Sequence, residues 1–148
     1  MKNKKLTIKF EELGLNAEII KALKENGFEA PFPIQQEAIP FILRGIDVIG
    51  QAHTGTGKTA AFALPILTKI RRRGPLQAVI LAPTRELAVQ VTAEFEKFAR
   101  YTGIRVVSIY GGQSIGIQYK QLRKGVQIVV ATPGRLIDHI KRRSISLK

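Results

Sequence analysis

The stretch that decides the fold of this chain is Ala52-His53-Thr54-Gly55-Thr56-Gly57-Lys58-Thr59. It follows a short apolar run at 46–50 and opens a segment of helical character, which is the order strand, glycine-rich turn, helix. Gly55 and Gly57 permit backbone conformations that other residues resist, so successive N–H groups can point inward at an anion. The positive end of the following helix strengthens that field. The stretch therefore predicts a loop that holds phosphate groups.

The side chains of this loop predict a nucleotide site. Lys58 would reach the β- and γ-phosphates, and the hydroxyl of Thr59 would ligate Mg²⁺. Thr54 precedes the first glycine of the loop, and Thr56 lies between the two glycines. The stricter phosphate-loop pattern has a glycine where this chain has Ala52. We interpret His53 as a loop residue whose backbone matters, rather than as an acid or base.

The remainder of the chain predicts a parallel sheet covered by helices. Four apolar runs have the composition of buried strands, at 46–50, 78–82, 105–110 and 126–131. Helix-like segments alternate with them, at 58–72, 86–101, 115–124 and 134–142. This alternation is typical of a parallel α/β sheet, in which ligands bind at the carboxyl ends of the strands. His139 falls in the last helical segment, where we expect a surface residue and not a ligand.

The residues before the first apolar run predict helices. Asn16 can cap a helix whose apolar residues share one face, and Gly27 should end it. A second helix is expected at about 34–44, with Pro40 as a kink or a break.

Composition and charge limit which partners and which kinds of site this chain can have. The chain has 148 residues with 24 Lys and Arg against 11 Asp and Glu, a net charge of +13 that suggests an anionic partner such as nucleic acid or nucleotide. A basic surface that serves only solubility is the plainer alternative. Cysteine is absent, which excludes disulfides and thiolate metal sites and fits a cytoplasmic protein. No apolar run is long enough for a membrane span.

A second group of residues carries a resemblance to a known family. Residues 27–35, Gly-Phe-Glu-Ala-Pro-Phe-Pro-Ile-Gln, resemble the Q motif of DEAD-box ATP-dependent RNA helicases, with Phe10 as its upstream aromatic. The resemblance implies that Gln35 reads the adenine edge of ATP and that Phe28 stacks near the ring. An amide both donates and accepts hydrogen bonds, so it can distinguish adenine from guanine.

Three further motifs resemble the family's RNA-contact motifs, in the family's order: Pro83-Thr84-Arg85-Glu86-Leu87-Ala88, Gly111-Gly112 and Thr132-Pro133-Gly134-Arg135. Thr84 and Thr132 would begin helices, whose free N–H groups suit phosphates, although threonines there also serve as N-caps. Arg85 and Arg135 can supply charged hydrogen bonds. The resemblance implies contacts to the RNA backbone that do not depend on base sequence.

The resemblance also implies a RecA-like fold of the P-loop NTPase type that is incomplete within 148 residues. We expect residues 1–9 to be a basic flexible tail, 10–45 a Q-motif helical region and 46–148 the α/β core. The Asp-Glu-Ala-Asp motif, the Ser-Ala-Thr motif and a second RecA-like domain are expected beyond Lys148. About four strands remain, and the strand at 46–50 would lack its usual neighbours. Three outcomes are therefore expected. The 148 residues are part of a longer chain, the strand at 46–50 pairs elsewhere in a rearranged sheet, or its exposed edges promote self-association.

Alternatives from other classes remain open on these residues. The chain could be a non-catalytic half-domain that binds nucleotide or RNA without hydrolysis. Gly111-Gly112-Gln113 resembles part of the transporter-ATPase signature, but Ile109-Tyr110 precede it where that signature has Leu-Ser. A GTPase would need an Asn-Lys-x-Asp guanine reader, which the chain lacks. A DNA helicase of a related family is a milder alternative.

Overall fold

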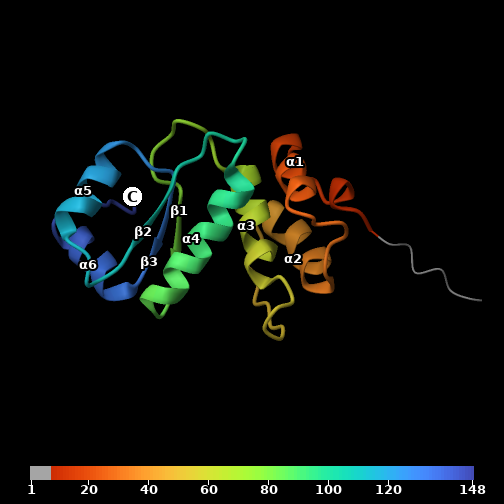
Figure 1. Ribbon diagram of the computed structural model, residues 1–148, viewed down its shortest axis with the longest axis horizontal. Helices are drawn as coiled ribbons and strands as arrows, with labels where there is room; N and C mark the ends of the chain where they lie inside the picture. Colours follow the sequence, from red (N-terminus) through yellow and green to blue (C-terminus); the bar gives the residue numbers. More distant parts are fainter. Residues whose placement is uncertain (1–7) are drawn as a thin grey trace, which may run out of the picture. The chain divides into compact units, whose positions relative to one another are not determined.

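The computed structural model describes residues 8–148, so most of the predicted tail at 1–9 lies outside the described residues. The chain divides into two compact units, Met1–Lys69 and Ile70–Lys148. The first is helical and the second combines helices with a sheet (Figure 1). No helix within residues 8–148 is long and apolar enough to cross a membrane.

The first unit consists of a short 3-10 helix followed by three α-helices: η1 (Phe10–Glu12), α1 (Ala17–Glu25), α2 (Pro33–Leu43) and α3 (Lys58–Lys69). The predicted cap of α1 is confirmed, because Asn16 Oδ1 accepts a hydrogen bond from the Ile19 amide at 3.2 Å. Gly27, beyond the end of α1, has φ +75°. The segment predicted at 34–44 is helical, and Pro40 lies inside α2 without ending it. Helices α2 and α3 pack against each other, and α1 also contacts α3.

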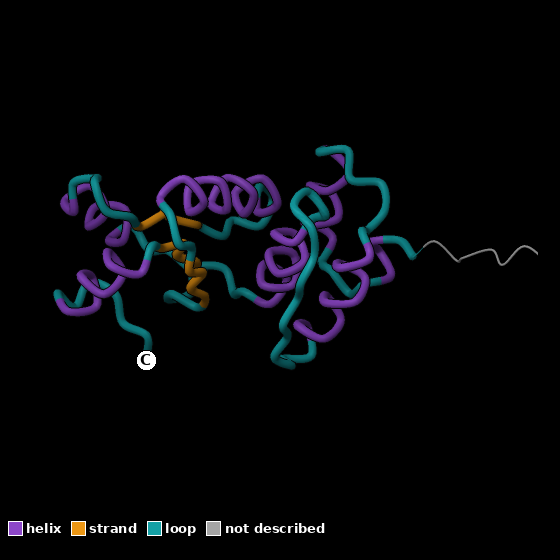
Figure 2. Tube along the Cα trace, turned by 90° about the horizontal axis from the view of Figure 1, so that it is seen from below, coloured by secondary structure: helices purple, strands orange, loops and turns teal. Residues whose placement is uncertain are grey.

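The second unit is a three-stranded parallel sheet with helices between and after the strands. Its elements are β1 (Ala78–Leu81), α4 (Arg85–Ala99), β2 (Val106–Ile109), α5 (Ile115–Arg123), β3 (Ile128–Ala131) and α6 (Pro133–Lys141). The strand order is β1-β3-β2, and β3 is in register with Ala78–Leu81 on one side and Val106–Ile109 on the other. Helix α4 packs on β2 and β3, and α5 and α6 lie together on the opposite side of the strands (Figures 1 and 2).

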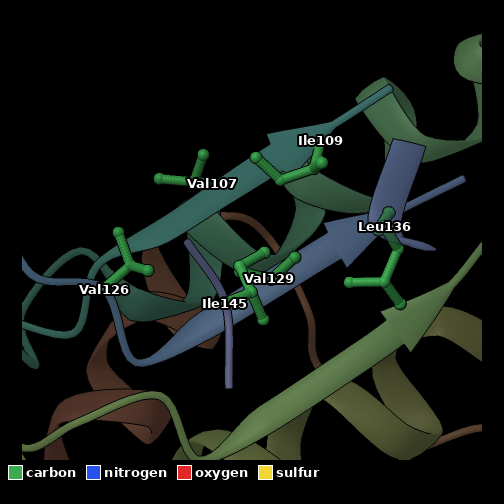
Figure 3. Packing of buried hydrophobic residues seen from close by; sticks show 7 residues of the cluster. Val107, Ile109, Val126, Val129, Leu136 and Ile145 are labelled. Atoms are coloured by element: carbon green, nitrogen blue, oxygen red, sulfur yellow. The ribbon is translucent and has the colours of Figure 1, made fainter. Parts of the chain in front are cut away.

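One face of this sheet carries a compact apolar cluster, drawn in Figure 3. Alternate residues of the strands point into it, where Leu136 from α6 and Ile145 from the C-terminal segment meet them. The buried members are Val107, Ile109, Val126, Val129, Ala131, Leu136 and Ile145. Because β3 lies between two strands, all four of its residues are fully buried, as the apolar run predicted.

The predicted strand at 46–50 is wrong. These residues have no regular structure, and the sheet of the described residues contains only the other three predicted strands. Ile46, Val48 and Ile49 are exposed, Ile49 fully so. The physical reason is that a strand needs a neighbour for its backbone N–H and C=O groups, and none of the three strands pairs with it. The expectation that it pairs elsewhere in a rearranged sheet fails for the same reason.

Candidate functional sites

The phosphate loop has the backbone conformation that its glycines predicted. Gly55 and Gly57 have φ +80° and +79°, a region that residues with a Cβ adopt only at a cost. Lys58 is the first residue of α3, so the loop leads directly into a helix N-terminus. The Thr56 hydroxyl donates to the carbonyl oxygen of His53, which closes the turn. Lys58 and Thr54 are exposed and Thr59 is half-buried, so the loop faces solvent without a strand before it.

Gln35 joins the Q motif to the phosphate loop. Its side chain is fully buried. Nε2 donates to the carbonyl oxygen of Gly57 at 3.1 Å, and Oε1 accepts from the Phe32 amide at 2.9 Å. Both ends of the amide are therefore used within the protein, and the loop is held against the start of α2. An amide can make four hydrogen bonds, so these two leave one N–H of Nε2 and one lone pair of Oε1 for a further partner such as a base.

The two aromatic residues predicted for the nucleotide site lie on one hollow. The hollow has a volume of about 320 Å³, and its lining includes Phe10, Leu23, Gly27 and Phe28. Phe10 is almost completely buried and forms part of the wall, whereas Phe28 is half-buried. Lys24 and Glu11 form an ion pair at 3.0 Å on its rim. The hollow has an apolar wall and a polar rim, which suits a flat heteroaromatic ring.

The second unit gathers the other predicted motifs at one edge of its sheet. Each strand is followed within three residues by a motif: β1 by Pro83-Thr84-Arg85, β2 by Gly111-Gly112 and β3 by Thr132-Pro133-Gly134-Arg135. Because the strands are parallel, their carboxyl ends lie at the same edge. The tertiary fold therefore brings together segments that lie up to about fifty residues apart in the chain.

Direct contacts connect these segments. The Arg85 guanidinium lies over the Tyr110 ring, with its carbon 5.6 Å from the ring centre. The same guanidinium approaches Gly112 so closely that a Cβ there would lie 3.4 Å from Nη1. Gly112 has φ +86° and both paired glycines are exposed, so their backbone is open to a ligand. Thr84 and Pro83 are exposed beside them.

The two threonines that were expected to begin helices differ in their side-chain hydrogen bonds. The side chain of Thr84 accepts a hydrogen bond from the Leu87 amide at 3.2 Å, so it caps α4. Thr132 occupies the N-cap position of α6 but makes no side-chain capping bond, and Pro133 follows it. Thr132 and Gly134 line a hollow of about 500 Å³ together with Gly111, Arg135 and Lys141.

Arg135 is less exposed than a ligand-binding arginine was expected to be. Its side chain is 16% exposed, and Nη1 donates to the carbonyl oxygen of Gln113 at 2.8 Å and to Gln118 Oε1 at 3.2 Å. Its Nε lies 3.9 Å from Asp138 Oδ2. The guanidinium thus connects the start of α6 to the paired-glycine loop and to α5.

The prediction that His139 is a surface residue is wrong. The ring is fully buried, with Nε2 2.8 Å from Gln118 Oε1 and Nδ1 2.7 Å from Ser144 Oγ. Burial, and then the nearby Arg135 charge, lower the pKa of His139 below its ordinary value. Gln118 and Ser144 are likewise not among the site residues that the sequence predicts. A signal was present, because Gln118 interrupts the apolar spacing of Ile115 and Leu122 on α5.

Comparison with known proteins decides the family. The family model described as DEAD/DEAH box helicase matches residues 32–148, most of the chain. The chain belongs to this family. It is 51% identical over 144 residues to the DEAD-box ATP-dependent RNA helicase CshA of Bacillus licheniformis, and 53% identical over 142 residues to CshA of Streptococcus pneumoniae. These alignments cover 97% and 95% of this chain.

Solved structures of DEAD-box proteins share the fold. A DEAD box protein from the hyperthermophile Methanococcus jannaschii matches with a TM-score of 0.89 and 43% identity over 94% of this chain. A hypothetical ATP-dependent RNA helicase from Sulfolobus tokodaii matches with a TM-score of 0.81 and 38% identity over 88%. The RecA-like α/β fold is therefore confirmed. The chain spans 27–30% of the length of the two CshA relatives and 38% of each solved chain.

Proposed function

We propose that this chain is the ATP- and RNA-binding portion of an ATP-dependent DEAD-box RNA helicase. The hydrogen bond from Gln35 to the carbonyl oxygen of Gly57 carries the proposal, because it joins the Q motif to the phosphate loop. A glutamine that only started a surface helix would have no reason to be fully buried against that loop.

The nucleotide is assigned to the first unit. The loop at 54–57 receives the phosphates, and Lys58, the residue of this chain assigned to catalysis, places its charge beside the β- and γ-phosphates. Thr59 offers one hydroxyl oxygen to Mg²⁺. A single hydroxyl ligand fits an ion that arrives with the nucleotide phosphates and keeps several waters. Within residues 8–148 no group of three or more His, Cys, Asp or Glu side chains is placed to hold a metal ion. Phe10, Phe28 and Gln35 take the base.

RNA is assigned to the carboxyl edge of the sheet in the second unit. Exposed glycine backbone and two helix N-termini suit phosphate and sugar groups, so binding should depend little on base sequence. The net charge of +13 adds a long-range attraction for a polyanion. The residues assigned to RNA are Pro83, Thr84, Arg85, Gly111, Gly112, Thr132, Pro133, Gly134 and Arg135.

Hydrolysis and unwinding are assigned to parts that residues 1–148 do not contain. The family's Asp-Glu-Ala-Asp motif is absent from the sequence, and by resemblance a second RecA-like domain supplies an arginine finger. Such a finger is worth about a thousandfold or more in phosphoryl transfer. We therefore expect the 148-residue chain to show negligible ATPase activity. Turnover that depends on Lys58 would overturn this expectation. The absence of cysteine separately fits our expectation of a cytoplasmic location.

Calorimetric titration with Mg-ATP tests the nucleotide proposal. Saturable binding that Lys58→Ala and Gln35→Ala both weaken, with weaker binding of GTP, would support it. A folded chain that gives no binding heat would refute it. The same chain titrated with single-stranded RNA and with DNA of equal sequence separates an RNA protein from a DNA helicase, since the 2′-hydroxyl is the chemical difference.

A non-catalytic binding half-domain is the second candidate, and the absence of the acidic motif from these residues favours it for the 148-residue chain. ATPase assays on the chain alone and on a longer chain that includes both the acidic motif and the second RecA-like domain distinguish the two. Activity restored by the longer chain supports the helicase, and inactivity of both supports the binding module.

A further inference from the structure

The buried amide of Gln118 connects three segments of the second unit. Gln118 lies on α5 and is completely buried. Nε2 donates to the Tyr110 carbonyl oxygen at 2.9 Å and to Gln113 Oε1 at 3.1 Å, on either side of the paired glycines. Oε1 accepts from Arg135 Nη1 at 3.2 Å and lies 2.8 Å from His139 Nε2, both on α6. One side chain thus makes four hydrogen bonds, which is all that an amide can make.

The hydrogen-bond chemistry determines the direction of each contact. Tyr110 O is a carbonyl oxygen and can only accept, so the amide nitrogen of Gln118 must face the loop and its oxygen must face α6. His139 Nε2 must then carry a proton, because it faces that oxygen. The single proton of the Ser144 hydroxyl has two possible acceptors, Nδ1 of the neutral ring at 2.7 Å and the His139 carbonyl oxygen at 3.1 Å, and Nδ1 is the nearer of the two. The lowered pKa of His139 is consistent with a neutral ring.

The network holds two predicted RNA-contact segments at a set spacing. Arg135 Nη1 also donates to the Gln113 carbonyl oxygen at 2.8 Å, so Gln113 is bonded through its backbone to α6 and through its side chain to Gln118. The loop with Gly111 and Gly112 leads directly into this residue. Those exposed glycines make no such bonds themselves, so their position depends on their neighbours.

We propose that Gln118 is a positioning residue for RNA binding, with His139 and Ser144 as its support. Gln118 holds the Gly111-Gly112 backbone and the Arg135 guanidinium so that they meet adjacent phosphate or sugar groups of one strand. This inference rests on the proposed RNA-binding function, because it states that the network positions groups that bind RNA and does not only stabilise the fold.

Two variants of Gln118 and one matched control test the network. Gln118→Met keeps the size of the side chain but removes all four bonds. Gln118→Glu keeps an acceptor toward Arg135 and His139 but loses both donors toward the loop. Gln121→Met is the matched control, a glutamine on the same helix that is only half-buried and outside the network. If Gln118→Met does not fold, Gln113→Ala replaces it, because it removes a single partner at a partly exposed position.

Two measurements on the 148-residue chain decide the proposal. The first is the ¹⁵N relaxation order parameter of the Gly111 and Gly112 amides without RNA, which should fall from about 0.85 to below 0.6 in Gln118→Glu and Gln118→Met. The second is the affinity for single-stranded RNA across a salt series. It should fall roughly tenfold in both variants, about the weight of one charge-assisted hydrogen bond. The slope of log affinity against log salt should become shallower by about 0.7 for each lost phosphate contact.

The outcomes are distinct. A mobile glycine loop with weakened RNA binding and an unchanged Gln121→Met control would support the proposal. Unchanged order parameters or wild-type RNA affinity in a folded Gln118 variant would overturn it. A folded wild-type chain that binds no RNA would overturn the proposed function and this inference with it. A wild-type chain that binds RNA, beside a folded Gln118 variant that binds it equally well, would overturn the inference alone.

Discussion

Gln35 donates a hydrogen bond from Nε2 to the carbonyl oxygen of Gly57 at 3.1 Å, across 22 positions of sequence. The bond connects the start of α2 to the last loop residue before α3, and the other end of the amide is bonded to the Phe32 backbone. The phosphate loop and the Q motif are therefore joined by a direct hydrogen bond within the first unit. The first two predictions below test this bond, and the next two test the helix starts and the buried histidine of the second unit.

Gln35→Leu should destabilise the protein and loosen the phosphate loop. The substitution removes both hydrogen bonds of a fully buried amide: the Phe32 amide loses its partner, and the Gly57 carbonyl keeps only the Ala61 amide. We therefore expect a loss of about 1–3 kcal/mol in the free energy of unfolding. Urea unfolding followed by circular dichroism measures it. Gln36→Leu is the control, because the Gln36 side chain is half-buried and donates one hydrogen bond, from Nε2 to the Pro31 carbonyl oxygen at 2.9 Å. Equal losses in the two variants would contradict the special role of Gln35.

Gly57→Ala should cost more stability than Gly55→Ala. Both glycines have positive φ, so each substitution carries a backbone cost of roughly 1–2 kcal/mol. A Cβ at Gly55 meets open space, whereas one at Gly57 would collide with Gln35 Nε2 and break its hydrogen bond. We expect the difference between the two unfolding free energies to be about 1 kcal/mol or more. Identical free energies would show that the Gln35 contact does not form in solution.

Thr84→Ala should destabilise α4 by about 0.5–2 kcal/mol, because its side chain caps the helix. Thr132→Ala should change stability much less, since Thr132 makes no side-chain capping bond. Thermal unfolding of both variants provides the measurement. The RNA affinity of the same variants then tests Thr132 as a ligand-binding residue, because a loss of affinity in Thr132→Ala would not come from loss of a helix cap. A large stability loss in Thr132→Ala would reverse this assignment.

Stability should decline as the pH falls below the ordinary histidine pKa of 6.5. Burial, and then the charges of Arg135 and Arg142, lower the folded-state pKa of His139, whereas the carboxylate of Asp138 acts to raise it. Tyr119 from α5 packs edge-on against the His139 ring, with 5.4 Å between the ring centres. The unfolded chain therefore binds more protons between the folded pKa and 6.5, and the full stability is present only above 6.5.

The check is urea unfolding across pH 5 to 8 with matched histidine variants. His139→Gln should flatten the decline, whereas His53→Gln, at the other histidine of the chain, should leave it in place. A decline of the same size in His139→Gln would show that other groups cause it.

Ile49→Lys should reduce self-association without loss of stability. Ile49 is fully exposed and flanks exposed Val48 and Ile46, an apolar segment with β-branched composition that invites pairing with other chains. The change in unfolding free energy should stay within about 0.5 kcal/mol, as for other surface substitutions. Sedimentation velocity at rising concentration measures association. A wild-type chain that stays monomeric throughout would show that this segment does not associate.

Local sequence signals predicted most of the elements in this chain. Asn16 was predicted as a cap because its short side chain can reach the backbone N–H groups of the next turn, and that bond is present. The runs at 78–82 and 126–131 were predicted as strands because β-branched residues suit a buried sheet, and strands lie within both. The same argument failed at 46–50, since apolar composition cannot supply the neighbouring strand that a strand needs.

The buried hydrogen-bond network around His139 also depends on contacts between residues that are distant in sequence. The sequence predicts a surface position for His139, because no residue near it in the chain suggests a partner. Its partners include Gln118, 21 residues away, and only the packing of α5 against α6 brings them together. A buried polar atom must find a hydrogen bond, but the sequence does not state which residue provides it.

The sequence by itself determined the glycine conformations of the phosphate loop, the helix starts and the order of the motifs, because these depend on residues within a few positions of one another. Only the tertiary structure decided that residues 46–50 stay unpaired, that Gln35 bonds Gly57, and that Gln118 joins the paired glycines to Arg135. Those outcomes depend on which distant backbone and side-chain groups become neighbours, and a hydrogen bond is made only where the fold brings donor and acceptor within about 3 Å.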